Sequence, residues 1–189
     1  ELEDDASIQC AHTIATESSQ LDVMNFKLLK VTGTAGSAPT VTFTVKDKAG
    51  NAVPMSELKV TPGRLALGLA GPTSNPGYTN FGADVTTGGY VAENATTAAC
   101  GQDGTCTFTF AHSIPAGAAG TFSVGIEGRR GQTLNPGIQN KQINNVSYGC
   151  KNVVFDFSVD ASPVVKRRTV VTLDQCNGCH VALSLHGEN

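Results

Sequence analysis

The sequence predicts a mainly β protein, an antiparallel split β-barrel or Greek-key sandwich, followed by a short C-terminal segment of different character. The 189 residues are 40% hydrophobic and 15% charged, which is a globular balance and enough chain for one sizeable core. The 21 glycines, together with frequent Thr and Val, favour strands joined by turns over helices. Several runs also alternate between apolar and polar residues, as half-buried strands do.

The alternating runs predict seven to nine strands at roughly even spacing, as in β-sandwiches and small barrels. In the clearest run, residues 39–47, Val41, Phe43 and Val45 should face the core while the threonines between them face water. A turn is expected at 48–51 and a long loop at 129–145, which is rich in Gly, Asn and Gln. The other expected strands lie at 26–31, 58–60, 64–70, 90–91, 105–110, 120–127 and 151–159.

The character of the chain changes near Pro163, where a basic cluster, Lys166, Arg167 and Arg168, follows the last expected strand. We therefore expect a β domain over 1–162 and the start of a second module over 163–189. The basic cluster either protects a strand edge from pairing or contacts anionic groups. The formal net charge of -3 argues against nucleic acid as a partner, and no apolar run approaches the roughly 20 residues that span a bilayer.

The six cysteines fall into two sets. Cys176 and Cys179 belong to a C-x-x-C-H motif that ends at His180, and four cysteines remain. Those four are expected to form disulfides in an oxidising compartment, and three pairings of them are possible. Cys100 and Cys106 flank a run of turn-forming residues and could close a hairpin loop. A Cys10–Cys150 bond would then tie the N-terminal region to a late strand.

The C-x-x-C-H motif is typical of covalent haem attachment. Two thiols separated by two residues match the spacing of the haem vinyl groups, and His180 can donate an imidazole nitrogen to iron. A thioredoxin-type pair is disfavoured because the chain has no βαβ pattern. A zinc site is disfavoured because it needs four ligands and only His186 lies nearby. The motif therefore predicts one haem c and electron transfer.

The second axial ligand is left open by the sequence. His186 follows His180 by six residues, too few for the backbone to return over the opposite haem face. It is therefore expected to bind the iron of a neighbouring haem. His12 and His112 are the other candidates, and His112 is expected to be an ordinary loop histidine.

Residues 164–189, including the Cys176–His180 motif, resemble the join between a β domain and a haem domain in the OmcA/MtrC family of outer-surface decahaem c-type cytochromes. The runs 39–51, 69–73 and 114–128 are similar to the family's mid-chain β domain. The resemblance implies a split β-barrel beside haem domains, a place on the extracellular face of the bacterial outer membrane (or in the periplasm), and bis-histidine haems. It also implies electron transfer to metal oxides, soluble metals or flavins, and partnership with other haems or cytochromes.

The resemblance assigns roles to particular residues. Cys176 and Cys179 would form the thioethers, His180 would be the proximal ligand and His186 a distal ligand of another haem. The family's β domains carry a disulfide, for which Cys100–Cys106 is the candidate. A decahaem protein needs ten motifs and this chain has one, so we expect a piece of a longer chain or a shortened relative.

Two other functions compete with that of an electron carrier. The β domain could be a binding module that docks a partner cytochrome, a flavin or a mineral surface. An open haem site could also support enzymatic chemistry, including terminal metal reduction, although the sequence shows no catalytic triad, phosphate loop or dinucleotide fingerprint.

Overall fold

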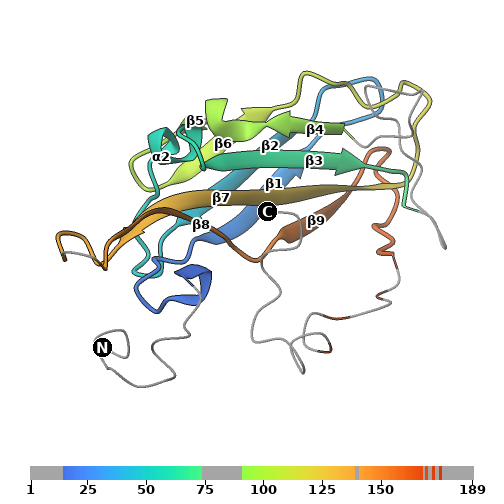
Figure 1. Cartoon of the computed structure of the whole chain (residues 1–189). Helices are drawn as coiled ribbons and strands as arrows, with labels where there is room; N and C mark the ends of the chain where they lie inside the picture. The colour runs from blue at the N-terminus through green and yellow to red at the C-terminus, as the bar shows by residue number, and fades with distance from the viewer. Residues whose placement is uncertain are drawn as a thin grey trace.

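The computed structural model describes residues 15–73, 91–138 and 141–167, with Thr169, Thr172 and Gln175 beyond them. Nine strands in this part of the chain form two antiparallel sheets that pack face to face (Figure 1). Sheet A has the strand order β1 (Asn25–Thr32), β2 (Thr40–Lys46), β6 (Thr105–Thr109), β5 (Ala99–Cys100). Sheet B has the order β4 (Val91–Asn94), β3 (Arg64–Ala70), β7 (Thr121–Leu134), β8 (Ile143–Gly149), with β9 (Val153–Ser158) also on β7. The predicted antiparallel sandwich is confirmed, and the described strands do not close into a barrel.

Strand β2 follows its predicted pattern. Val41, Phe43 and Val45 are almost completely buried, and the residues between them are half-buried. Their neighbour β1 alternates in the same way until a bulge between Leu28 and Lys30 breaks the register. An extra residue in one strand leaves a side chain without an inward position, and Leu29 is accordingly 41% exposed.

Strand β7 is the spine of sheet B and runs the length of the molecule (Figure 1). It pairs with β3 along one edge, while β9 and β8 pair end to end along the other. Residues 150–152 separate β8 from β9 and lie opposite only two residues of β7, because Gly149 pairs with Arg129 and Val153 with Ile126. The β8–β9 edge therefore has one residue more than β7 at this point, and Cys150 lies in this irregular stretch.

The core lies between the two sheets. Each sheet contributes its inward-facing apolar residues, as expected for a sandwich. The largest side chains that are essentially inaccessible are Phe43, Phe110, Phe122, Met24, Leu58, Leu65, Leu67 and Leu69. A smaller cluster of Leu21, Leu134, Val146 and Tyr148, with Ala15 against it, joins the N-terminal region near the short 3-10 helix η2 (Ala15–Glu17) to the far end of β7.

The strand predicted at 58–60 is wrong, because this region contains the short helix α2 (Met55–Lys59). Pro54 precedes the first turn, where its missing N–H costs no hydrogen bond, and Met, Glu, Leu and Lys are good helix formers. Only Leu58 is buried. The helix ends before the Thr61-Pro62-Gly63 run, and Val60 is left extended and 67% exposed.

The loop predicted at 129–145 is also wrong over most of its length. Strand β7 continues to Leu134 and β8 already begins at Ile143. Pairing between the two strands outweighs the weak strand propensity of their Gly, Asn and Gln residues. Two short elements, β5 and the 3-10 helix η3 (Ala95–Thr97), were not predicted.

Candidate functional site

The four residues predicted to bind haem, Cys176, Cys179, His180 and His186, lie outside the described residues, as do Cys10 and His12. Their roles therefore stay predictions. The structure describes the segment that follows β9 as far as Arg167, with Thr169, Thr172 and Gln175 beyond it, and the contacts of this segment with the sandwich.

The chain leaves the sandwich through a turn held by Asp160. Its carboxylate accepts hydrogen bonds from the backbone N–H of Gly120 (2.8 Å), the backbone N–H of Ser162 (3.0 Å) and the hydroxyl of Ser158 (3.0 Å). Hydrogen bonds from Ser162, Gly120 and Ser158 hold the pKa of Asp160 well below its ordinary value, because they stabilise the charged form. Ala161 takes a left-handed φ of 61°, which reverses the chain. We call this turn the Asp160 clasp.

Beyond the clasp, Val165 fastens the exit segment to sheet B. Its N–H donates to Oγ1 of Thr121 at 2.8 Å, and its carbonyl accepts from Oγ1 of Thr73 at 3.0 Å. Thr73 in turn hydrogen-bonds the backbone carbonyl of Thr121. Residues from three separate parts of the chain therefore meet at the first residue of β7.

The basic cluster is not part of a strand where it is described. Lys166 is exposed and Arg167 is half-buried, and both follow the fastened Val165 without regular secondary structure. The strand-edge interpretation is therefore wrong for these two residues. Arg168 lies outside the described residues.

A second local set of hydrogen bonds, between Thr172 and Gln175, lies directly before the haem motif. The side-chain Oε1 of Gln175 accepts from the backbone N–H of Thr172 at 2.9 Å, and the N–H of Gln175 donates to the carbonyl of Thr172 at 3.1 Å. A Gln side chain that returns to the N–H three residues earlier is half of a capping box, and Gln175 has helical geometry. The T-x-x-Q spacing is a signal that sequence analysis could have used. Such a start suits a motif whose two thiols must lie about one helical turn apart.

His112 is a loop histidine, as predicted. It follows β6, and its Nδ1 lies 2.7 Å from Oε1 of Glu93. Glu93 also accepts from the backbone N–H groups of Ala111 and His112, at 2.8 and 3.0 Å. Burial works to raise the pKa of Glu93, but these hydrogen bonds outweigh it and the pKa is lowered. The pair secures the loop after β6, which gives His112 a structural role.

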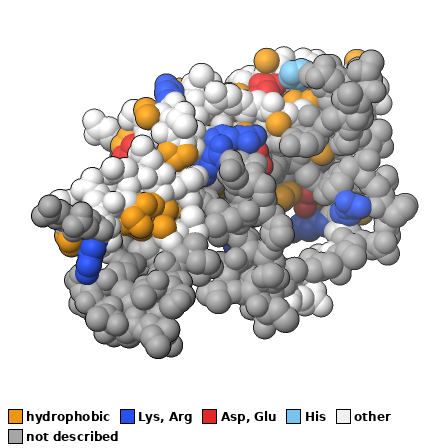
Figure 2. Space-filling model, in the orientation of Figure 1, with side chains coloured by type: hydrophobic (Ala, Val, Ile, Leu, Met, Phe, Trp, Pro, Cys, Tyr) orange, Lys and Arg blue, Asp and Glu red, His pale blue; other side chains and the backbone are white. Residues whose placement is uncertain are grey.

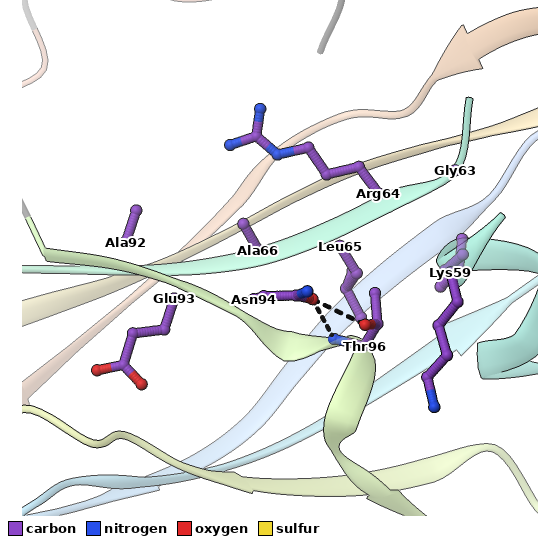
Figure 3. A pocket seen from close by; sticks show the side chains of 10 residues that line it. Lys59, Gly63, Arg64, Leu65, Ala66, Ala92, Glu93, Asn94 and Thr96 are labelled. Atoms are coloured by element: carbon purple, nitrogen blue, oxygen red, sulfur yellow. Dashed lines mark hydrogen bonds between the residues drawn. The ribbon is translucent and has the colours of Figure 1, made fainter. Parts of the chain in front are cut away.

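A pocket of about 450 Å³ lies beside Glu93, between α2, β3 and β4 (Figure 3). Its two cationic side chains do not converge, because Lys59 and Arg64 point to opposite sides in this view. Arg64 is paired with Glu127 at 2.8 Å, and the Asn94 side chain caps η3 through the N–H of Thr96. Arg64, Glu93 and Asn94 thus bond to the protein itself, and the polar groups that line the pocket do not converge on one ligand position.

The predicted Cys100–Cys106 disulfide is present and links β5 to β6 across the turn at 101–105. Cys150 is a free, buried thiol in the described part of the chain, and burial raises its pKa to about 12. Its pairing with Cys10 stays a prediction. Among the described residues no group of three or more His, Cys, Asp or Glu could hold a metal ion. No helix in the same ranges is long and apolar enough to cross a membrane.

Comparison with known proteins finds solved structures of similar fold, two of which are described below. No protein-family model and no curated protein sequence matches the chain. The structure resembles MtrC from Shewanella baltica OS185, with a TM-score of 0.48 and 20% identity over 85% of this chain. It also resembles the outer membrane decaheme cytochrome OmcA, with a TM-score of 0.49 and 18% identity over 85% of this chain.

Both neighbours carry the names of the family that the sequence resembles. The chain spans about a quarter of their length, 26% of MtrC and 27% of OmcA.

Proposed function

We propose that this chain carries one covalently attached c-type haem at Cys176, Cys179 and His180 and transfers electrons through it. The observation that carries the proposal is the motif itself, Cys176-Asn177-Gly178-Cys179-His180. Its two thiols and one imidazole are the donors that attach and ligate haem c. The Thr172–Gln175 bonds directly before the motif support it, since they start a helical turn where the thiol spacing requires one.

The chemistry of the haem, when bound, is one-electron exchange at its iron. The chain's own residues attach it through two thioethers and supply an imidazole ligand from His180. Histidine rather than methionine as the second ligand would keep the reduction potential low, because Met/His ligation raises it. Met24 is in the core and Met55 begins α2, so both methionines of the chain belong to the sandwich and lie far from the motif in sequence.

The wider role that we propose is that of a β domain and first haem motif within an extracellular multihaem cytochrome at the bacterial outer membrane. The resemblance of residues 164–189 to the join between such domains supports it. The acceptors that this role implies are metal oxides, soluble metals or flavins. In this setting His186 would bind the iron of a neighbouring haem.

The first experiment is the reduced pyridine haemochrome spectrum with the intact mass of the protein after expression with haem-maturation machinery. We expect a c-type α-band and a mass of 19.5 kDa plus one haem. The Cys176→Ala/Cys179→Ala variant should lose both signals. The matched Cys150→Ala variant, which removes a thiol outside the motif, should keep them. Wild-type protein without covalent haem would refute the proposal.

The role of His186 needs a separate readout. Because its proposed iron belongs to another haem, His186→Ala should leave the haem content of this chain unchanged. The coordination state read from the Soret and visible spectrum should also be unchanged. His180→Ala should alter that spectrum, because it removes the proximal ligand. An altered spectrum in His186→Ala would instead make His186 a ligand of the haem in this chain.

A further inference from the structure

The exit segment runs over the outer face of sheet B. Phe122 and Val124 point into the core, so their neighbours Thr121 and Ser123 point outward. Outward-facing residues of a sandwich are usually exposed to solvent, yet Thr121 and Ser123 are only 3% and 5% exposed. The hydrogen bond from Val165 to Oγ1 of Thr121 shows that the chain crosses the sheet at this point.

Next to this crossing, the same face has a shallow apolar groove. The strand register aligns four small or apolar residues across it. Gly68 pairs with Ala92 on one side and Gly125 on the other, and Gly125 pairs with Val154. The groove has a volume of about 170 Å³, and Val154 on its edge is 61% exposed.

The floor of the groove is open. A Cβ added at Gly125 would meet no described atom within 4 Å, and one at Gly68 would meet only the Val91 carbonyl, at 3.8 Å. Because the paired residues Gly68 and Gly125 carry no side chains, the sheet face is flat at this point, which suits a flat apolar group. Figure 2 shows this side of the molecule, where the described hydrophobic side chains lie in small groups among basic ones.

The length of the chain brings the haem motif within reach of the groove. Thr121 and Gly125 are four positions apart in β7, a distance of about 13 Å along a strand. Val165 and Cys176 are eleven positions apart, which span at most about 36–40 Å when fully extended. The segment after the motif, Val181-Ala182-Leu183-Ser184-Leu185, is apolar enough to share such a surface.

We propose that the outer face of sheet B seats the haem-bearing segment 176–189, with the edge of the haem lying in the Gly68–Gly125 groove. The Asp160 clasp and the Thr121–Val165 bond are the positioning elements, since they direct the exit segment onto this face. The inference rests on the proposed function, because it needs haem at Cys176 and Cys179.

The test uses tryptophan as a reporter, because the chain has none. Excited tryptophan transfers energy to haem with an efficiency that falls with the sixth power of distance. Asn152→Trp places the reporter at the exposed rim of the groove. Thr107→Trp places it at an exposed position on the outer face of sheet A. Each is compared with its own haem-free form, made with Cys176→Ala/Cys179→Ala.

We expect the reporter at 152 to be much more strongly quenched by haem than the reporter at 107. Filling the groove with Gly125→Phe should relieve the quenching at 152. Gly117→Phe should leave it unchanged, since Gly117 is exposed and equally open. Thr121→Val removes the acceptor for Val165 and should relieve part of the quenching.

Equal quenching at 152 and 107, or no effect of Gly125→Phe, would overturn the inference while the haemochrome spectrum still supported the proposed function. Quenching at 152 that rises with protein concentration would overturn it in favour of a second copy of the chain on this face. Absence of haem from the unmodified chain would overturn both proposals, and the haemochrome spectrum identifies that case directly.

Discussion

Replacing Arg130 with methionine should destabilise the sandwich more than the same change at any surface arginine. The Arg130 side chain is only 9% exposed and points inward from β7. Its guanidinium donates to Asp22 Oδ2 at 2.8 Å, to the Asp22 carbonyl at 3.1 Å and to Glu57 at 2.9 Å. Its Nε donates to the Tyr148 hydroxyl, which itself donates to the Asp22 carbonyl at 2.7 Å. One side chain thus joins the N-terminal region, α2, β7 and β8.

The expected loss of stability follows from the burial of the partners. Removing one member of a buried ion pair costs about 3–5 kcal/mol when the other stays buried and unpaired. Here Asp22 and Glu57 are 31% and 49% exposed, so both carboxylates regain water when the arginine is lost. We therefore expect about 2–3 kcal/mol for Arg130→Met, since methionine still fills much of the volume.

The matched control is Arg64→Met. Arg64 also pairs with a carboxylate at 2.8 Å, but it is 41% exposed and its partner Glu127 is 25% exposed. An exposed pair of this kind contributes about 0–1 kcal/mol. Urea unfolding followed by far-UV circular dichroism gives both values. Equal losses of unfolding free energy for the two variants, or a smaller loss at Arg130, would refute the reasoning that burial makes the contacts of Arg130 more stabilising than those of Arg64.

Three further predictions concern the cysteines and the Glu93 loop. Replacing Cys100 and Cys106 together with alanine should cost about 2 kcal/mol in urea unfolding, the closure entropy of a loop of about seven residues; an unchanged midpoint would contradict this. Cys150 should resist iodoacetamide in the native protein and react in urea; if it instead needs both urea and a reductant, the predicted bond to Cys10 forms. The lowered pKa of Glu93 means that its contribution to stability is present above the unfolded value of 4.5 and is lost as the pH falls below it. Glu93→Gln should therefore flatten the acid limb of the stability profile, and an unaltered limb would show that the carboxylate contributes nothing.

Sequence patterns predicted the strands whose side chains alternate without interruption. In β2 every second residue is a Val or Phe, so period and composition agree. The far half of β7 could not be found in this way, because its inward position 130 is an arginine and its next residues are Gly131 and Gln132. Arg130 can face inward because the Tyr148 hydroxyl on the neighbouring strand and two carboxylates more than seventy residues away in sequence converge on it. No local pattern contains that information.

The failure at α2 has a different cause. The apolar pair Leu58 and Val60 fits a strand period of two, but two residues are too few to establish a period. Val60 lies beyond the end of the helix and takes no part in it. The deciding features lie outside the pair. Pro54 opens the helix and Pro62 follows its end, and the helix buries Leu58 alone. Boundary residues were therefore more informative here than hydrophobic spacing.

The chemistry of the candidate site could be predicted from the sequence, but the contacts that fasten the exit segment to the sandwich could not. The C-x-x-C-H motif carries its meaning in five consecutive residues, because thiol spacing and the adjacent imidazole are local properties. The hydrogen bond between Val165 and Thr121 joins residues 44 positions apart and has no such signature. Local signals did exist on either side of it, in the Asp160-x-Ser162 turn and the Thr172-x-x-Gln175 box.

These two local devices bracket the chain between the sandwich and the haem motif. The first fixes where the exit segment starts, because Asp160 bonds both to β7's entry at Gly120 and to its own turn. The second starts a helical turn at Thr172, and Gln175 in this turn is the residue directly before Cys176. A haem attached to a free tether would sample many distances to its neighbours, and electron transfer depends steeply on distance. The bond between Val165 and Thr121 limits that range at one end of the segment, and the Thr172–Gln175 bonds order the local turn at the other end. In the role proposed above, the β domain would restrict where the haem can lie by fastening the start of the segment that carries it.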